Sequence, residues 1–250
     1  MFDDSLIAPA PRAATAPGPA APVARSRLAT PRIRTLPGVY APQEDSLLLA
    51  SVLAAEPLDG ARVLDLCTGS GLLAATAARH GADVAAVDVS RRAVLTARMT
   101  LRRLGCRGEV RRGDLLEAAP GGTWDLVVSN PPYVPAREDE LPRAGVRRAW
   151  DAGRSGRAIL DAICTAAPAR LRPGGSLLLV QSEVADVEGT LRRLRDQGLE
   201  VEVAARRRIP FGPVMRRRAE ALRRAGRLRP GATDEELVVV RGRRPGEAAA

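Results

Sequence analysis

Short apolar runs alternate with helical segments along most of the chain, and this alternation limits the possible folds more than any other feature. The runs at 61–66, 83–89 and 124–129 are typical of buried parallel strands. Helical segments follow them, and two of these end before a glycine, at Gly81 and Gly105. Repeated strand–helix units join into a sheet whose two faces are covered by helices. The sequence therefore predicts a doubly wound α/β domain.

The same pattern divides the chain into three regions. Residues 1–36 are rich in Ala, Pro and Arg, lack a sustained apolar period and predict a flexible leader. Residues 37–246 contain the strand–helix units and predict one domain. Within it, residues 206–231 form an arginine-rich insertion between the last two strands. The other elements that we expect are strands near 110 and at 176–180, 199–205 and 236–241, and helices at 71–80, 90–104, 157–171 and 187–197.

Basic charge lies mainly at the two ends of the chain. All 39 basic residues are arginine, against 29 acids and one histidine, which gives a formal net charge of +10. The lack of lysine fits a GC-rich genome, so the choice of arginine carries little functional information. Aromatic residues are scarce, with two each of Trp, Tyr and Phe. This scarcity argues against a nucleic-acid surface built on stacking rings.

Cysteine, histidine and apolar patterns exclude several classes of protein. Cys67, Cys106 and Cys164 are widely spaced and His80 is the only histidine, so neither a disulfide framework nor a metal site is expected. No stretch approaches 18 apolar residues, and the N-terminus has no apolar run of signal-peptide length. We therefore expect a cytoplasmic protein without a membrane partner.

A glycine-rich loop follows the run at 61–66. Gly69 and Gly71 begin a G-x-G-x-x-A pattern, and Asp88 lies 19 residues beyond Gly69, where a ribose-binding acid is expected. This pattern suits either a nicotinamide dinucleotide or S-adenosylmethionine. Asp65 favours the second cofactor, because its charge just before the loop would repel a pyrophosphate and attract the α-ammonium of a methionine moiety.

Acidic residues also follow the next two strands. Asp88 would accept hydrogen bonds from ribose hydroxyls, and Asp114 could accept one from an adenine amine while the backbone of Leu115 donates. The carboxyl ends of parallel strands form the ligand-binding edge of an open α/β sheet. Each acid could instead cap a helix or lie in a solvated turn, and for Asp114 the two interpretations stay open.

The segment Asn130-Pro131-Pro132-Tyr133 directly follows the run at 124–129. Proline cannot continue a sheet ladder, so the chain turns sharply there. An NH2 group that is to be methylated needs two acceptors to hold its hydrogens, and the Asn130 side chain and the Pro131 carbonyl form such a pair. Tyr133 would pack on a planar amide or base. The segment therefore predicts methyl transfer to a planar nitrogen by alignment, without a histidine base.

In combination, the loop at 63–71, the acids after the strands and the segment 125–133 resemble the HemK-type methyltransferases, which act on a glutamine side-chain amide in class 1 translation release factors. The stretches 38–49 and 149–157 resemble motifs of the eukaryotic and archaeal branch of that family. The resemblance covers about residues 38–205 and the last strand. It implies a class I S-adenosylmethionine methyltransferase fold, which is Rossmann-like with a seven-stranded, mostly parallel sheet and an antiparallel last strand.

The resemblance implies further contacts and partners. Substrate contacts fall on residues 130–133, and the eukaryotic branch implies a small activating subunit. The family often has glycine where this chain has Cys67, and we interpret that cysteine as a small buried residue rather than a reactive thiol. With the glycines of the loop, the expected cofactor contacts are Ser46, Asp65, Cys67, Gly69, Gly71, Asp88, Asp114, Leu115 and Asn130.

The insertion at 206–231 contains ten arginines. If the strand before it is parallel to the first strand, the insertion overhangs the substrate side of the sheet. One hypothesis is that it recognises an anionic partner such as RNA, a ribosome-bound factor or DNA. The alternative is a solvated basic helix in an arginine-biased chain.

Four functions are compatible with these patterns. The leading one is methylation of a protein glutamine, as in a release factor. The second transfers the methyl group to adenine N6 in a nucleic acid or to a small molecule, since Asn-Pro-Pro-Tyr suits any planar NH2 group. The third is a nicotinamide-dependent oxidoreductase, which leaves residues 130–133 unexplained. The fourth is a non-catalytic cofactor-binding module, which the intact Asn130 and the acidic positions disfavour.

Overall fold

A computed structural model describes residues 33–246, so most of the predicted leader lies outside the described residues. Seven strands form one sheet in the order β3-β2-β1-β4-β5-β7-β6. The strands are β1 (Arg62–Leu66), β2 (Asp83–Asp88), β3 (Glu109–Arg112), β4 (Trp124–Ser129), β5 (Leu171–Ser182), β6 (Glu200–Pro210) and β7 (Asp234–Arg243). The helices are α1 (Glu44–Leu53), α2 (Leu72–Arg79), α3 (Arg91–Arg103), α4 (Ala158–Ala166), α5 (Val187–Asp196) and α6 (Pro213–Arg224).

The sheet is parallel except for β7, which runs antiparallel to both of its neighbours, β5 and β6. The predicted fold class, with a mostly parallel sheet and an antiparallel last strand, is confirmed. The helix expected at 157–171 ends at Ala166, because Pro168 cannot continue it and begins a 3-10 turn. β5 then begins at Leu171 and passes through an irregular Pro-Gly-Gly turn before regular pairing resumes at Ser176.

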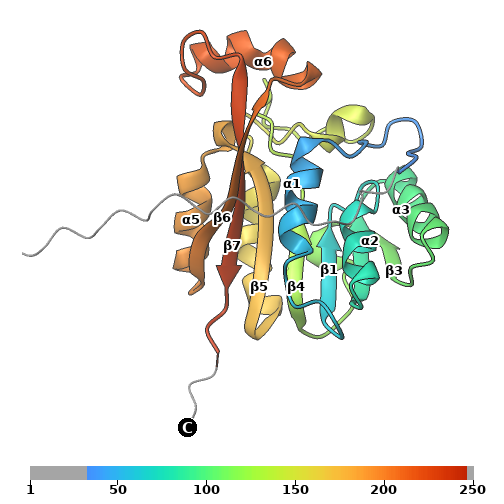
Figure 1. Ribbon diagram of the computed structural model, residues 1–250. Helices are drawn as coiled ribbons and strands as arrows, with labels where there is room; N and C mark the ends of the chain where they lie inside the picture. Colours follow the sequence, from blue (N-terminus) through green and yellow to red (C-terminus); the bar gives the residue numbers. More distant parts are fainter. Residues whose placement is uncertain (1–32, 247–250) are drawn as a thin grey trace, which may run out of the picture.

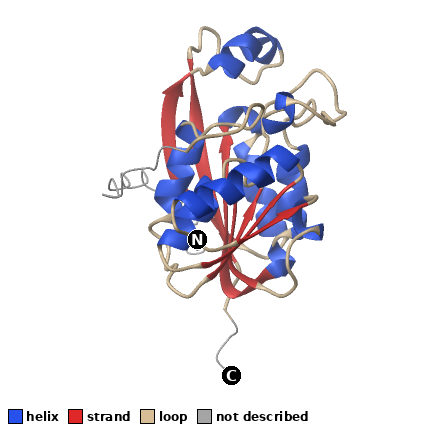
Figure 2. Cartoon of the chain, turned by 90° about the vertical axis from the view of Figure 1, so that its right-hand side faces the viewer, coloured by secondary structure: helices blue, strands red, loops and turns tan. Residues whose placement is uncertain are grey.

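Alternate residues of the central strands point to two hydrophobic layers. Val63 and Val128 pack under α1, α2 and α3, whereas Leu64 and Val127 pack under α4 and α5. Both faces of the sheet are thus covered (Figures 1 and 2), which explains why the strand sequences are continuously apolar. The ligand-binding edge is left open at the carboxyl ends of the parallel strands.

The β6–β7 pair extends beyond the rest of the sheet and carries α6 at its far end (Figure 1). The strand expected to end at residue 205 continues to Pro210, because β7 supplies pairing partners as far as Asp234. Ion pairs across the strands, such as Arg206 with Glu236 at 2.7 Å, balance the arginine charges. The insertion therefore begins at Phe211 rather than at residue 206. We call residues 211–233 the arm.

Residues 33–246 contain neither a membrane-spanning helix nor a cluster of metal ligands. No helix in this range has the length and apolar character needed to cross a membrane. Within the same range, no group of three or more His, Cys, Asp or Glu side chains is arranged to hold a metal ion.

Gly71 generates the first prediction, because it joins the glycine loop to α2 at a point of close packing. Its φ is +78°, and a Cβ placed on it would lie 2.8 Å from Cα of Ala97 in α3. Gly71→Ala should therefore combine backbone strain with a steric clash and lower the free energy of unfolding by about 2–4 kcal/mol. Urea denaturation measures the change.

Gly60 provides the matched control. Its φ of +69° is similar, but a Cβ there would meet nothing within 4 Å. Gly60→Ala should cost only the backbone strain, about 1–2 kcal/mol. Equal losses in the two variants would show that packing against α3 is not what requires glycine at position 71.

Candidate active site

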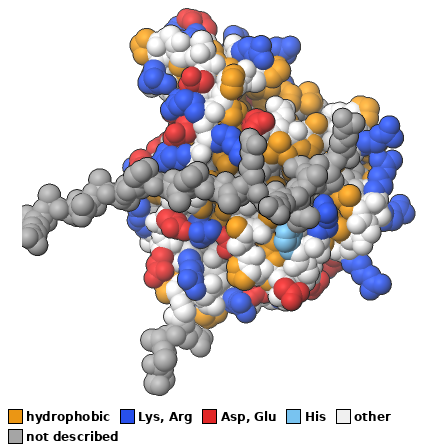
Figure 3. All heavy atoms as spheres, viewed as in Figure 1, with side chains coloured by type: hydrophobic (Ala, Val, Ile, Leu, Met, Phe, Trp, Pro, Cys, Tyr) orange, Lys and Arg blue, Asp and Glu red, His pale blue; other side chains and the backbone are white. Residues whose placement is uncertain are grey.

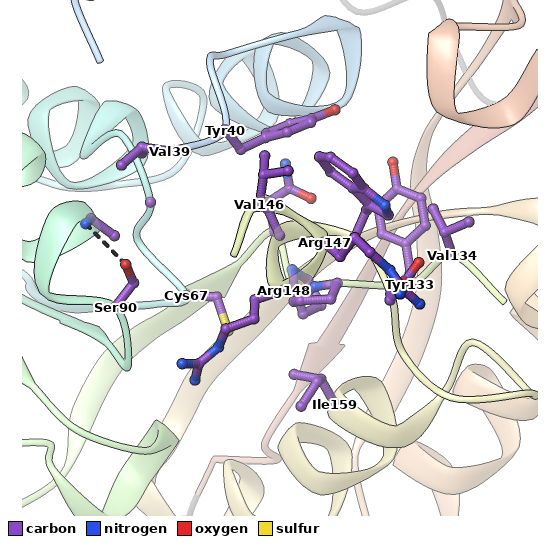
Figure 4. A pocket seen from close by; sticks show the side chains of 18 of the residues that line it. Val39, Tyr40, Cys67, Ser90, Tyr133, Val134, Val146, Arg147, Arg148 and Ile159 are labelled. Atoms are coloured by element: carbon purple, nitrogen blue, oxygen red, sulfur yellow. Dashed lines mark hydrogen bonds and ion pairs between the residues drawn. The ribbon is translucent and has the colours of Figure 1, made fainter. Parts of the chain in front are cut away.

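A cavity of about 1220 Å³ opens at the carboxyl ends of β1, β2, β3 and β4. The loops that follow these strands line its floor, the segment 141–151 and the first turn of α6 line its walls, and Glu235 of β7 also faces it. Figure 4 shows Tyr40 and Tyr133 on one side of this space and Cys67 and Ser90 on the other. The cavity thus brings together the glycine loop and residues 130–133.

The glycine loop turns tightly beside Asp88. Cys67 and Gly69 have φ angles of +58° and +52°. The Gly69 N–H donates to Asp88 Oδ2 at 2.9 Å, and the Ser90 N–H donates to Oδ1 at 2.8 Å. Burial raises the pKa of Asp88, and these two hydrogen bonds oppose that rise. The carboxylate is half-buried, so it keeps acceptor capacity toward the cavity.

Asp65 does not line the cavity. Its side chain is fully buried beneath the loop, where Oδ2 accepts from Thr68 Oγ1 at 2.6 Å and from the Ala74 N–H at 3.1 Å. Burial raises its pKa to about 7, and Oδ1 has no partner within residues 33–246. The expected direct contact with an ammonium group does not fit this geometry, because Asp65 instead fixes the loop to the start of α2.

Gly71 is not among the lining residues, although Ser70 and Leu72 on either side are, and it allows the close packing of α2 on α3. Cys67 does line the cavity, and burial raises the pKa of its thiol, which disfavours a reactive thiolate. Asp114 and Leu115 lie at the cavity rim after β3, where Leu115 has a φ of +38°. The structure thus brings Cys67, Gly69, Asp88, Asp114 and Leu115 to one end of the cavity.

Asn130 is held in one orientation at the centre of the cavity. Its Nδ2 donates to Ser46 Oγ at 3.1 Å, and the Ser46 hydroxyl donates to Asp45 Oδ1 at 3.1 Å. Because the amide nitrogen is directed at Ser46, the side-chain oxygen of Asn130 can accept hydrogen bonds from a ligand. Ser46, expected to contact the cofactor, lines the cavity and also orients Asn130.

Asp45 is the residue that the sequence analysis missed. Its carboxylate is 5% exposed and accepts from the hydroxyls of Tyr40 at 3.2 Å and Tyr133 at 3.0 Å. Burial, followed by the charge of Asp45, raises the pKa of both tyrosines, so both hydroxyls stay protonated as donors. The signal in the sequence was the motif at 38–49, which contains both Tyr40 and Asp45.

The chain that leaves Tyr133 is tied to the cavity wall and to the arm. The Val134 N–H donates to the Trp150 carbonyl at 2.7 Å. Asp151, 1% exposed, pairs with Arg147 and with Arg218 of α6, each at 2.7 Å. Apolar residues of the arm also pack against Val134. The arm is therefore a fixed wall of the cavity.

Most arginines of the predicted insertion pair within the protein. Acidic and basic side chains alternate on the face shown in Figure 3. Arg216 and Arg217 of α6 are exposed, and Arg217 lines the cavity. The paired arginines are Arg206, Arg207, Arg208, Arg218, Arg223, Arg224 and Arg229, which contact acids, and Arg227, which contacts backbone carbonyls.

Glu235 is a second carboxyl group that the sequence analysis did not identify. It is 4% exposed and faces the cavity, and its Oε2 has no hydrogen-bond partner within the described range. Burial raises its pKa from 4.5 to about 7, a hydrogen bond from Ser182 opposes the rise, and Asp45 adds to it. No motif in the sequence pointed to this residue.

Comparison with known proteins gives matches to methyltransferases. Residues 30–149 match the family model for the methyltransferase small domain. A protein of Methanocaldococcus jannaschii assigned as an N5-glutamine methyltransferase is 32% identical over 185 residues, covering 74% of this chain and 92% of that protein. The release factor glutamine methyltransferase of Bordetella pertussis is 39% identical over 182 residues, covering 68% of this chain and 66% of that enzyme. The chain thus spans about two thirds of the bacterial relative's length.

A solved structure with a similar fold is the E. cuniculi Mtq2–Trm112 complex, which is responsible for methylation of the translation termination factor eRF1. It superimposes with a TM-score of 0.59 at 26% identity, covering 83% of this chain and 99% of the matched one.

The raised pKa of Glu235 generates a prediction for stability. Between pH 4.5 and about 7 the folded state keeps a proton that the unfolded state has released, so stability is lost as pH rises through this window. Glu235→Gln removes this loss. The free energy of unfolding of the variant, taken relative to that of wild type, should therefore rise by about 2–3 kcal/mol from pH 4.5 to pH 8.

Urea denaturation at the two pH values measures this gain. Glu236→Gln is the control, because Glu236 pairs with Arg206 and its loss removes an ion pair without relieving a buried charge. A difference between Glu235→Gln and wild type that does not change with pH would contradict the prediction.

Proposed function

Because this chain belongs to the HemK-type family of S-adenosylmethionine-dependent methyltransferases, we propose that it methylates the side-chain amide of a glutamine in a protein substrate. A translation release factor is the first candidate, since relatives carry that activity in their names. The observation that carries the proposal is the fixed orientation of Asn130 by Ser46 at the end of β4.

The donor set at one end of the cavity fits S-adenosylmethionine. The Asp88 carboxylate keeps acceptor capacity for ribose hydroxyls, and Asp114 with the Leu115 backbone suits an adenine edge. The left-handed backbone at Cys67 and Gly69 brings main chain to the cavity surface without a side chain at Gly69. When bound, the cofactor supplies a methyl group on a sulfonium, which is already a good electrophile.

The residues after β4 would align the acceptor. The Asn130 side-chain oxygen and the Pro131 carbonyl accept the two amide hydrogens, which aims the nitrogen at the methyl group. Tyr133 packs beside the planar amide while its hydroxyl is held by Asp45. The N–CH3 bond would form as the S–CH3 bond of the sulfonium breaks to leave S-adenosylhomocysteine, and one N–H proton would pass to solvent. Catalysis rests on this prearranged geometry.

A partner subunit is part of the proposal. The E. cuniculi neighbour forms a complex with Trm112, and we propose that this chain also acts with a small activating subunit. Assays are therefore best run with the chain purified from its own cells as well as alone, so that a required subunit is retained.

Asn130→Ala tests the alignment. The variant should lower kcat by about 100-fold or more, because one of the two acceptors is lost. Its affinity for S-adenosylhomocysteine, measured by isothermal titration, should change little, since Asp88 and the glycine loop remain. Transfer of radiolabelled methyl to a purified class 1 release factor gives kcat. Unchanged turnover would contradict the mechanism.

The same assay distinguishes the acceptors. Incubation of cell extract with labelled cofactor, followed by separation of protein from nucleic acid and small molecules, shows which fraction carries the methyl group. Label in protein supports a glutamine acceptor, and label confined to nucleic acid would favour adenine N6.

The arm generates a prediction for substrate binding. Arg216 and Arg217 are exposed beside the cavity, whereas their neighbours are paired, so these two residues would contact an anionic partner. The double variant Arg216→Glu/Arg217→Glu should raise KM for the release factor several-fold at low salt, and this increase should be smaller at high salt. Arg102→Glu/Arg103→Glu at the end of α3 is the control. Equal KM values would show that the arm is a structural wall only.

A further inference from the structure

We propose that Glu235 forms a recognition subsite beside the acceptor position, where its Oε2 accepts a hydrogen bond from a main-chain N–H of the substrate segment that carries the methylated glutamine. The inference rests on the proposed function and extends it, because it assigns a substrate contact outside residues 130–133. Glu235 would act in recognition and not in the transfer itself.

The free oxygen of Glu235 is the first observation. Glu235 is 4% exposed and lines the cavity. Its Oε2 lacks a hydrogen-bond partner among residues 33–246. A buried carboxylate oxygen without a hydrogen bond is costly, and such groups are rare in folded proteins. Oε2 is itself buried, so a rotation of the Glu235 side chain would present it to a ligand in the cavity, and that ligand would supply the missing donor.

The position of Glu235 is the second observation. On β7 it pairs with Ile209 of β6, at the base of the arm. It lines the same cavity as Tyr40, Tyr133 and Asp45, and its charge adds to the raised pKa of both tyrosines. Tyr133 belongs to the segment proposed to hold the acceptor amide. A chain whose glutamine reaches Asn130 would therefore pass Glu235.

The residues around Glu235 indicate that Oε2 would bind a single neutral hydrogen-bond donor. Asp45 already accepts from Tyr40, Tyr133 and both the N–H and hydroxyl of Ser46, so it offers little to a further group. The remaining lining near Glu235 includes the apolar side chains Ile209, Met215 and Leu237. A cation would be desolvated there at high cost with a single free oxygen as partner, whereas a peptide N–H is satisfied by one acceptor.

The pH dependence follows from the groups around Glu235. The groups that act on it are Asp45 of α1, Ser182 at the end of β5 and Glu183 after it, and its own charge acts on Tyr40 and Tyr133. Arg217 and Arg218 of α6 line the same cavity. On the outer side Arg208 pairs with Asp234. Burial and these acids raise the pKa of Glu235 to about 7, so the stronger acceptor, the carboxylate, is formed as pH rises from 6 to 8. KM for the substrate should fall over this range.

Two variants separate the acceptor from the charge. Glu235→Met keeps the length of the side chain but makes it apolar, so it cannot accept a hydrogen bond. This variant should raise KM for the protein substrate about tenfold and leave kcat and the affinity for S-adenosylhomocysteine near wild type. Glu235→Gln keeps a neutral acceptor and should restore part of the affinity, with a KM that no longer changes between pH 6 and 8. Glu236→Gln is the matched control on the same strand.

A peptide that spans the methylated glutamine of a class 1 release factor identifies the donor. Each main-chain amide near the glutamine is N-methylated in turn, which removes one N–H at a time. One position should raise KM in the wild-type protein and have no further effect in Glu235→Met, because the two changes remove the same hydrogen bond.

The outcomes distinguish the two proposals. No methylation of release factor or peptide by the wild-type protein, with or without its partner subunit, would overturn the proposed function. Wild-type methylation with KM unchanged in Glu235→Met, or N-methyl effects equal in both proteins, would overturn the subsite alone.

Discussion

The Asp45 carboxylate is the interaction on which the rest of the site depends. It lies at the start of α1 and accepts from Tyr40, Tyr133 and Ser46, and Ser46 in turn holds the Asn130 amide. A helix near the beginning of the domain thereby fixes the segment after β4. Because one buried carboxylate satisfies all these donors, the side chains proposed to align the acceptor are set before any ligand binds.

The arm extends this constraint to the other wall of the cavity. Its arginines suggest a charged surface for a partner, yet most of them are used internally. Arg218 reaches the buried Asp151 and Arg227 donates to backbone carbonyls, while at the base of the arm cross-strand pairs balance Arg206 and Arg208 of β6. Packing of Phe211 and Met215 completes the contact with the chain after Tyr133. The net charge of the arm therefore exceeds the charge that is left unpaired, which lies on the exposed Arg216 and Arg217 of α6.

The acidic residues of this site differ in where their buried carboxyl groups lie. Asp65 and Glu235 both have pKa values raised to about 7 by burial, and each has one oxygen without a partner. Asp65 lies beneath the loop and organises the backbone, whereas Glu235 faces the cavity. Asp88 lies between these cases, since it holds the loop and still reaches the cavity. A carboxyl group is thus structural in one place and available to a ligand in another, according to where its second oxygen lies.

The sequence by itself determined the fold class, the order of the strands along the chain and the placement of Asp88, Asp114 and Asn130 at their carboxyl ends. These features depend on local periodicity and on the residue that follows each strand, which are written in neighbouring positions. It misjudged where β6 ends, because pairing with β7 and not local composition extends a strand through three arginines. Only the tertiary structure decided that Asp65 turns beneath the loop, that Asp45 joins Tyr40 to Tyr133 and that Glu235 enters the cavity. The Asp45–Tyr133 contact joins elements far apart in the chain. The directions of the Asp65 and Glu235 side chains are set by packing between layers, which no local pattern records.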